Sequence, residues 1–521
     1  MTPIRTIRLL TALFAALWLF ACAALPKDVH RPASYALAGT EDTRIGRAIA
    51  DELSAHPGKS GFFPLANGLD AFVARAVLAQ GADRSIDVQY YLYHDDLIGA
   101  LLTDQLIQAA DRGVRVRLLV DDMDLDGRDA GAAILDSHPH IEVRIFNPFT
   151  RNTARAPQFL TRYGSVTRRM HNKSFTVDNQ VTILGGRNIG NEYFEADPDL
   201  AFADLDVMAA GKVAGAVSTA FDLYWNSELA YPVSALKPEP PTEDQVEKMQ
   251  RQLDAVVSGP KSAAYIEALE RSHLADTFRK GDFSFHWGEA DVIYDEPEKI
   301  LRGMDETRYH MGPQIAPYFA GVEKELILFS PYFVPGKELT SFLTDLVRRG
   351  VTVRILTNSL ASNDVGIVHA GYAKYRKPLL AGGVQLYELN KKLTAEQRKE
   401  KKGVEGSSKA SLHAKSFVFD RRHVFVGSLN LDPRATIHNT EIGVVFDSPD
   451  LASEMAQWFV ENIDQVAFRL ELVEEKGGRE AIRWHGRAGG EPVTFDTEPY
   501  SGFWRRLGIG FLGLLPIESQ L

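Results

Sequence analysis

The stretch that decides the fold reads His-Asn-Lys-Ser-Phe-Thr-Val-Asp at residues 171–178, and it returns as His-Ala-Lys-Ser-Phe-Val-Phe-Asp at residues 413–420. A Gly-x-x-Asn follows each copy, and its asparagine, Asn188 or Asn430, lies seventeen residues after the histidine. One such motif can arise by chance, but two copies with matched followers cannot reasonably be explained that way. A repeat of this size predicts two similar domains.

Similar elements surround the two motifs. A buried strand, a helical stretch and a glycine turn into another strand precede each motif, and a further strand follows it. The predicted elements cover residues 86–91, 97–112 and 206–210 in the first half and residues 326–330, 338–349 and 441–445 in the second. This order predicts a β-α-β unit in each half, and therefore an α/β fold.

The repeated residue types point to phosphate chemistry. If the halves pack about a pseudo-twofold axis, His171 and His413 face each other in a pocket lined by two lysines and two asparagines. A neutral imidazole can attack phosphorus and form a phosphohistidine, while its protonated partner supplies a proton to the leaving alcohol. Such an exchange needs no metal and no cofactor. Zinc-site spacings and a Gly-x-Ser-x-Gly elbow are both missing from the sequence.

The duplicated motif resembles the phospholipase D superfamily over residues 62–464, and several shorter stretches resemble its bacterial cardiolipin synthase C branch. These stretches are Asp87-Val-Gln-Tyr-Tyr, residues 168–178, Gly-Gly-Arg-Asn-Ile-Gly190, Tyr224-Trp-Asn-Ser227 and the final eight residues. The resemblance implies two α/β domains related by a pseudo-twofold axis, each with a mixed β-sheet flanked by helices, sharing one site at their interface.

The resemblance also assigns roles to individual residues. The catalytic motif residues would be His171, Lys173, Asp178, His413, Lys415 and Asp420, of which the two aspartates are mainly structural in the family. Phosphate would be bound by Lys173, Asn188, Lys415 and Asn430. A carboxylate on the third strand would orient each histidine, a role for Asp206 and Glu441. Family habit favours His171 as the nucleophile, although symmetry leaves that choice open.

The implied reaction condenses phosphatidylglycerol with a second phospholipid, phosphatidylethanolamine or phosphatidylglycerol, to make cardiolipin. A phospholipase D hydrolase that releases phosphatidic acid is the nearest alternative. An exported nuclease and a lipid-binding scaffold with an inactive site are the others. The formal net charge of −11 disfavours a nucleic-acid partner, because such proteins usually carry an excess of Lys and Arg.

The N-terminus predicts export and lipidation. Arg5 and Arg8 precede an apolar run at residues 9–20, which is too short for an ordinary membrane span and has the length of a signal-peptide core. Cys22 is the only cysteine, and it follows Leu-Phe-Ala as in a bacterial lipobox. We expect an acylated lipoprotein on the periplasmic face of the envelope, at the outer membrane rather than the inner. An ordinary signal peptide or an uncleaved anchor is the alternative.

The length of 521 residues predicts several units, and the content of 45% hydrophobic and 24% charged residues excludes a disordered or polytopic membrane protein. We expect a signal peptide (1–21), a tether (22–60), a first domain (61–236), a linker or insertion (237–290), a second domain (291–464) and a C-terminal extension (465–521). Residues 391–410 read as a solvated loop or a basic lip for anionic headgroups. Residues 503–515 read as a closing helix or a membrane-contacting tail.

Overall fold

The computed structural model describes residues 25–151, 153–197, 200–280, 283–363, 365–391 and 409–512. The predicted signal peptide, Cys22, most of the basic loop and the end of the C-terminal tail lie outside these ranges. Within them, no helix is both long and apolar enough to cross a membrane. Nor do three or more His, Cys, Asp or Glu side chains gather there as metal ligands would.

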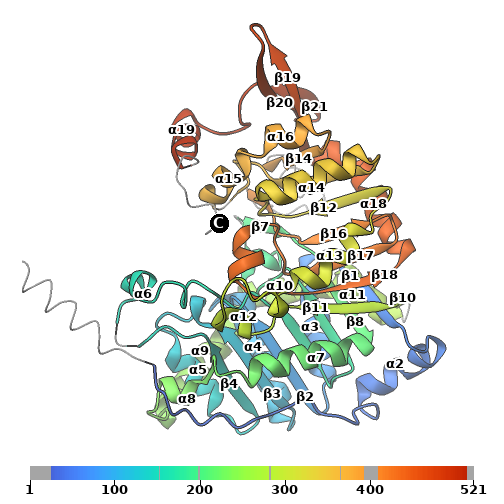
Figure 1. The fold of residues 1–521 in the computed structure, drawn as a ribbon. Helices are drawn as coiled ribbons and strands as arrows, with labels where there is room; N and C mark the ends of the chain where they lie inside the picture. The colour runs from blue at the N-terminus through green and yellow to red at the C-terminus, as the bar shows by residue number, and fades with distance from the viewer. Residues whose placement is uncertain are drawn as a thin grey trace, which may run out of the picture.

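The first half of the described chain forms a mixed sheet (Figure 1). Its strand order is β10 (His286–Gly288), β1 (Ser60–Leu65), β8 (Asp206–Gly211), β6 (Val181–Gly185), β5 (Ser174–Val177), β2 (Ser85–Tyr90), β3 (Arg115–Asp121), β4 (Ile141–Phe146) and β9 (Ala230–Pro232). Its helices include α2 (Arg44–Ala55), α3 (Gly68–Gly81), α4 (Leu97–Asp111), α5 (Asp129–Asp136), α6 (Arg155–Thr161), α7 (Lys212–Trp225) and α8 (Val233–Leu236).

The second half forms a sheet of the same design. Its strand order is β11 (Ala290–Tyr294), β18 (Ile442–Asp447), β17 (His423–Gly427), β16 (Ser416–Phe419), β12 (Glu325–Phe329), β13 (Thr352–Asn358), β14 (Gln385–Leu389), β19 (Ala467–Glu475), β20 (Arg479–Ala488) and β21 (Glu491–Phe495). Its helices include α12 (Glu298–Leu301), α13 (Gly312–Ala320), α14 (Gly336–Arg348), α15 (Gly366–Ala373), α16 (Arg376–Ala381), α18 (Pro449–Val466) and α19 (Phe503–Leu512).

The two sheets agree in strand direction as well as in order. β3 pairs in parallel with both β2 and β4, and β13 does so with β12 and β14. The motif strands β5 and β16 pair antiparallel with β2 and β12, and each continues through antiparallel partners to the sheet edge. The predicted α/β fold with two repeated domains is therefore confirmed.

Buried strands explain why the central segments are so apolar. All six residues of β2 and all five of β12 are buried, because helices pack on both faces of each sheet: α3 and α4 opposite α7 in the first, and α14 opposite α18 in the second. One continuous core contains Phe62 and Val207 of the first sheet together with Val424 and Phe446 of the second. The halves are thus joined by packed hydrophobic side chains, and a site between them has rigid walls.

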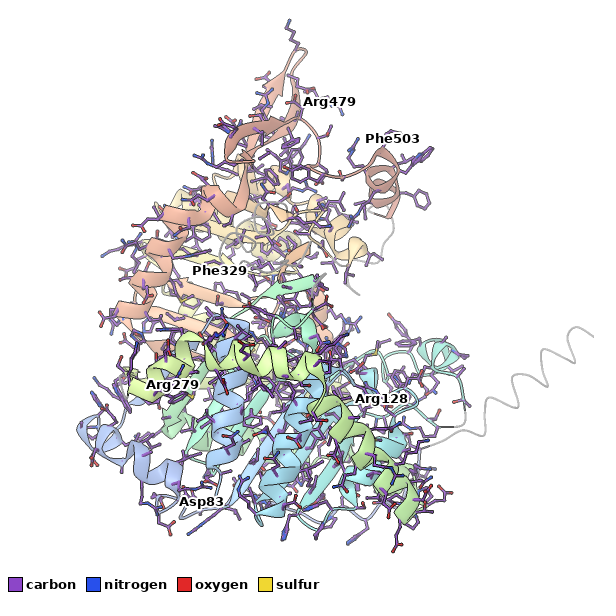
Figure 2. All side chains as sticks on the ribbon, turned by 180° about the vertical axis from the view of Figure 1, so that it is seen from behind. Asp83, Arg128, Arg279, Phe329, Arg479 and Phe503 are labelled. Atoms are coloured by element: carbon purple, nitrogen blue, oxygen red, sulfur yellow. The ribbon has the colours of Figure 1, made fainter. Side chains whose placement is uncertain are left out.

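Residues 237–290, which we expected to be a linker or insertion, lie on the first half. α9 (Glu243–Val257), α10 (Pro260–Glu270) and α11 (His273–Lys280) pack on α3, α4 and α5, and β10 extends the first sheet. The hydroxyl of Tyr265 donates to the carbonyl of Phe194 at 2.8 Å. The C-terminal strands β19–β21 extend the second sheet, so Arg479 lies at the far end of the molecule from Asp83 (Figure 2).

Candidate active site

The two motifs occupy equivalent places in the two sheets. His171 and Lys173 lie in the extended residues just before β5, and His413 and Lys415 lie just before β16. All four side chains are buried. The histidine and lysine therefore precede the motif strand, whereas alternation alone had suggested that they lie within it.

Each histidine is held by the other half of the molecule. The backbone N–H of His171 donates to the carbonyl of Thr440 at 2.9 Å, and its Nδ1 lies 2.8 Å from a carboxylate oxygen of Glu441. The N–H of His413 donates to the carbonyl of Ala203 at 2.8 Å. A short parallel pair, β15 (Lys409–Leu412) with β7 (Leu200–Ala203), brings the second histidine to this position. The packing of the two halves against each other therefore fixes the orientation of both imidazole rings.

The carboxylate that faces His413 is Asp204, and the prediction of Asp206 for this role was wrong. Asp204 Oδ2 lies 2.6 Å from His413 Nδ1, whereas Asp206 accepts a hydrogen bond from Arg75 Nη2 at 2.8 Å. The strand register explains the shift, because Asp206 pairs with Gly185 as Gly443 pairs with Gly427. Asp204 lies two residues before Asp206, and Glu441 lies two residues before Gly443, so Asp204 is the counterpart of Glu441.

Gly186 makes room for this carboxylate. A Cβ placed on Gly186 would lie 2.1 Å from an oxygen of Asp204, closer than any side chain can approach. The Gly185-Gly186 pair therefore serves close packing around two buried carboxylates, Asp204 and Asp206.

The lysines and asparagines complete the two sets. Lys173 and Lys415 each donate Nζ to the carbonyl of the histidine two residues earlier, at 2.6 Å in both copies. Asn188 accepts from the N–H of Leu92 at 3.2 Å. Asn430 is buried, and its Oδ1 has no hydrogen-bond partner in the described part of the chain. An unpaired buried acceptor of this kind is suited to a hydroxyl or amine donor of a bound ligand.

The electrostatics of the site disfavour protonation of His171 more strongly than protonation of His413. Burial, together with the charge of Lys173, holds the pKa of His171 well below its ordinary value, and burial with Lys415 lowers the pKa of His413. Burial also lowers the pKa of Lys173 to about 7. Two close ammonium groups are unfavourable in this setting, and an anionic phosphate between them would relieve the repulsion.

The two carboxylates differ from each other. Burial opposes ionisation of Asp204, but the charge and hydrogen bond of His413 outweigh it and lower the pKa of Asp204 to about 2. Burial raises the pKa of Glu441 well above its usual value, although the carboxyl group also accepts a hydrogen bond from Ser428. An ionised Asp204 stabilises a protonated His413 more than Glu441 stabilises a protonated His171.

The motif aspartates lie at the opposite ends of the motif strands. Asp178 accepts hydrogen bonds from three consecutive backbone N–H groups at residues 83–85, between 2.8 and 3.0 Å. Asp420 does the same for residues 323–325, between 2.7 and 2.9 Å. Both residues have a positive φ, near 50°. These contacts tie the motif strand to the start of β2 or β12 and give the aspartates a structural part in the fold.

Two supporting residues were missed by the sequence reasoning. Asp121, at the end of β3, binds Arg169 Nε at 2.8 Å and accepts from the N–H of Met170 at 2.9 Å. Asn358, at the end of β13, makes two hydrogen bonds to the backbone of Leu412, both at 2.9 Å. Each therefore fixes the residue before a motif histidine. Asp121 and Asn358 end equivalent strands of the two repeats, and this correspondence could have identified them from the sequence.

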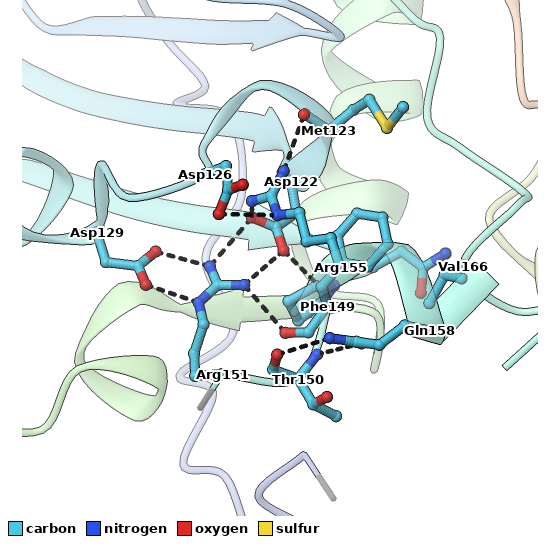
Figure 3. A network of polar contacts seen from close by, with 12 residues as sticks. Asp122, Met123, Asp126, Asp129, Phe149, Thr150, Arg151, Arg155, Gln158 and Val166 are labelled. Carbon is cyan, nitrogen blue, oxygen red and sulfur yellow. Dashed lines mark hydrogen bonds and ion pairs between the residues drawn. The ribbon is translucent and has the colours of Figure 1, made fainter. Parts of the chain in front are cut away.

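An ion-pair network anchors the loop that leads to His171 (Figure 3). Arg151 lies between the carboxylates of Asp122 and Asp129, at 2.6 and 2.7 Å, and Arg155 also reaches Asp122. The side-chain amide of Gln158 accepts a hydrogen bond from the N–H of Thr150 and donates one to its carbonyl. Asp122 follows Asp121 directly, so this network and the support of the histidine share one corner of the fold.

Known proteins resemble the chain over both halves. A sequence profile described as "Cardiolipin synthase, PLD-like domain" matches residues 77–225 and 318–463. Cardiolipin synthase C of Escherichia coli is 41% identical over 92% of this chain and all of its own length. An uncharacterized protein of Helicobacter pylori is 33% identical, over 92% of this chain and 93% of its own.

A solved structure agrees with the fold. Phosphatidylserine synthase of Haemophilus influenzae superposes with a TM-score of 0.53 and 14% identity, covering 80% of this chain and 90% of that one. Its sequence is too different to add more than the fold. Taken with the paired histidine sites and the profile match to both halves, these relatives show that the chain belongs to the cardiolipin synthase family of phospholipase D-like enzymes.

Proposed function

We propose that the protein is a phosphatidyltransferase that makes cardiolipin from phosphatidylglycerol and a second phospholipid, through a phosphohistidine. The observation that carries the proposal is the pair of buried imidazoles, each held at Nδ1 by a carboxylate of the other half. In this arrangement Nε2 of His171 is available to the substrate, and Nε2 of His413 lies 3.2 Å from Lys415 Nζ, beside the phosphate-binding lysines. The cardiolipin synthase C relative, 41% identical over its whole length, supports the choice of product.

In the first step, Nε2 of a neutral His171 attacks phosphorus of the donor phospholipid. The bond from phosphorus to the headgroup oxygen breaks, and protonated His413 gives its proton to that oxygen, so a headgroup alcohol leaves. The ionised Asp204 supports this division of roles, because it stabilises the proton on His413. Lys173, Lys415, Asn188 and Asn430 hold the phosphate oxygens while their charge changes.

In the second step, a hydroxyl group of phosphatidylglycerol replaces the histidine. His413 takes the proton of this hydroxyl, whose oxygen forms the new bond to phosphorus as the bond to His171 breaks. Both histidines then return to their starting states. Water in place of the alcohol would release phosphatidic acid, so exclusion of water decides between transfer and hydrolysis.

The membrane attachment is part of the proposal. Acylation of Cys22 tethers the enzyme to the periplasmic face of the envelope, at the outer membrane, where phospholipids reach the site by lateral diffusion. Both substrates are then lipids of the same membrane.

Lipid mass spectrometry tests the proposal directly. Purified protein is added to phosphatidylglycerol vesicles, with and without phosphatidylethanolamine. We expect cardiolipin to appear with the wild type and to vanish in His171→Ala and His413→Ala. His140→Ala, which changes an exposed histidine directly before β4, is the matched control and should retain activity. Phosphatidic acid without cardiolipin would indicate a hydrolase, and plasmid nicking without lipid turnover would indicate a nuclease.

A further inference from the structure

The C-terminal helix α19 exposes an unusual number of large apolar side chains. Phe503 is 61% exposed, Trp504 79%, Leu507 54% and Phe511 66%. We call these four residues the α19 face. At 100° per residue they fall within an arc of about 100° on one side of the helix. A soluble domain rarely leaves two phenylalanines and a tryptophan together in water.

The other side of α19 is fixed to the protein. Arg505 Nη2 donates to the carbonyl of Asn363 at 3.3 Å. The Ile509 side chain packs on the start of α15, where a Cβ on Gly366 would lie 3.0 Å from its Cδ1. Both residues project opposite the α19 face. The helix is therefore docked in one orientation, and the apolar arc points outward because of it (Figure 1).

The α19 face lies on the active-site side of the second domain. Asn358, at the carboxyl end of β13, supports the residue before His413, and residues 359–363 run buried from there to the contact with α19. From the first domain, α6 projects on the same side of the molecule in both views (Figures 1 and 2). Tyr163, just after α6, is 61% exposed.

The charge of the helix suggests what covers it. Residues 503–512 contain Arg505 and Arg506 and no acidic residue, although the whole chain has a net charge of −11. Tryptophan and phenylalanine beside arginine are typical of segments at a bilayer surface, and the basic residues favour anionic headgroups. Arg505 is on the docked side of the helix, whereas Arg506 flanks the α19 face. An anionic bilayer therefore matches the apolar arc and the basic residue beside it.

We propose that the α19 face inserts into the interface of a bilayer containing anionic phospholipid and holds the active-site side of the second domain against the membrane. This role goes beyond the transfer reaction, since it concerns how the folded enzyme meets the bilayer. It adds a second contact to the predicted anchor at the N-terminus. Two attachments would fix the orientation of the enzyme as well as its distance from the surface.

Quenching of tryptophan fluorescence by bromine-labelled acyl chains tests the insertion in the full-length protein. The vesicles contain phosphatidylglycerol, and the variants are Trp504→Phe and the matched control Trp458→Phe, which removes another exposed tryptophan, on α18. We expect most of the lipid quenching to be lost in Trp504→Phe and kept in Trp458→Phe. Equal quenching in the wild type and Trp504→Phe would overturn the proposal. The proposal would also be overturned if Trp504 were protected from quenching by aqueous acrylamide but not quenched by the labelled lipid, because the α19 face would then be covered by protein.

A second measurement separates this inference from the proposed reaction. The double variant Phe503→Ser, Leu507→Ser should transfer more slowly from vesicle phosphatidylglycerol and at the wild-type rate from dispersed short-chain phosphatidylglycerol. An equal loss on both substrates would contradict a role at the membrane. If the wild type makes no cardiolipin from either substrate, the proposed reaction fails, while the quenching result still decides the insertion.

Discussion

Two aspartates that lie two residues apart should respond to the same substitution in different ways. Asp204→Asn removes the charge that lies 2.6 Å from His413 Nδ1, and Asp206→Asn removes the charge that pairs with Arg75. Both carboxylates are buried. Asparagine has nearly the same shape as aspartate, so the difference between the variants reports the charge and its partner.

The partner of each carboxylate determines how much activity or stability its replacement should cost. Loss of a charge-assisted hydrogen bond to His413 costs about 3 kcal/mol, or about 10² in kcat, and a ring held in the wrong tautomer raises the loss toward ~10⁴. Asp206→Asn leaves Arg75, which is almost fully buried, without its charged partner and destabilises the fold by about 3–5 kcal/mol. We expect Asp204→Asn to lose turnover with little change in Tm, and Asp206→Asn to lose Tm with little change in turnover per folded molecule.

The pH profile provides a further readout. Asp204 raises the pKa of His413 against the lowering effect of burial and Lys415, so its removal lowers that pKa further. His413 then loses its proton at a lower pH, and the alkaline limb of the kcat profile moves to lower pH in Asp204→Asn. The assays are cardiolipin formation across pH and thermal unfolding. The assignment of Asp204 as the partner of His413 would be refuted if Asp204→Asn stayed active while Asp206→Asn was inactive with an unchanged Tm.

Three other outcomes are expected. Transfer should survive an excess of EDTA, since both steps use side chains alone; inhibition that zinc reverses would contradict this. Because the pKa of Lys173 is about 7 and its charged form holds phosphate, kcat/KM should fall as pH rises through 7, and this limb should be missing from the residual activity of Lys173→Arg. Arg151→Met should lower the free energy of unfolding by about 1–3 kcal/mol, because Asp122 and Asp129 lose their shared partner. It should also speed proteolysis within residues 147–168. Unchanged cleavage would argue against the anchoring role of the network.

The repeat in the sequence predicted most of the fold. The strand expected at 86–91 is β2, and the helices expected at 97–112 and 338–349 are α4 and α14. These predictions succeeded because hydrophobic periodicity and capping are local properties. Thr242 forms a capping box with Gln245, which fixes the start of α9.

Other features depend on contacts that a single sequence does not display. Asp204 was overlooked because the segment after the Gly-Gly pair is five residues longer in the first copy, so that the copies align correctly only through strand register. The segment 237–290 was predicted as a linker or an insertion, and its polar helix α9 has no buried residue, whereas Tyr265 and Leu274 beyond it join the first core. That each histidine is oriented from the opposite domain follows only from the packing of the two sheets.

This exchange of supports bears on the origin of the chain. His171 takes its carboxylate from the second repeat and His413 from the first, at positions that match in strand register. Two identical copies of one repeat, related by a twofold axis, would supply the same contacts to each other. A gene encoding a single repeat could thus have given a working homodimer before duplication and fusion joined the copies. In a fused chain the two copies can differ, and here Asp204 and Glu441 differ in side-chain length, while Asp121 and Asn358 differ in charge.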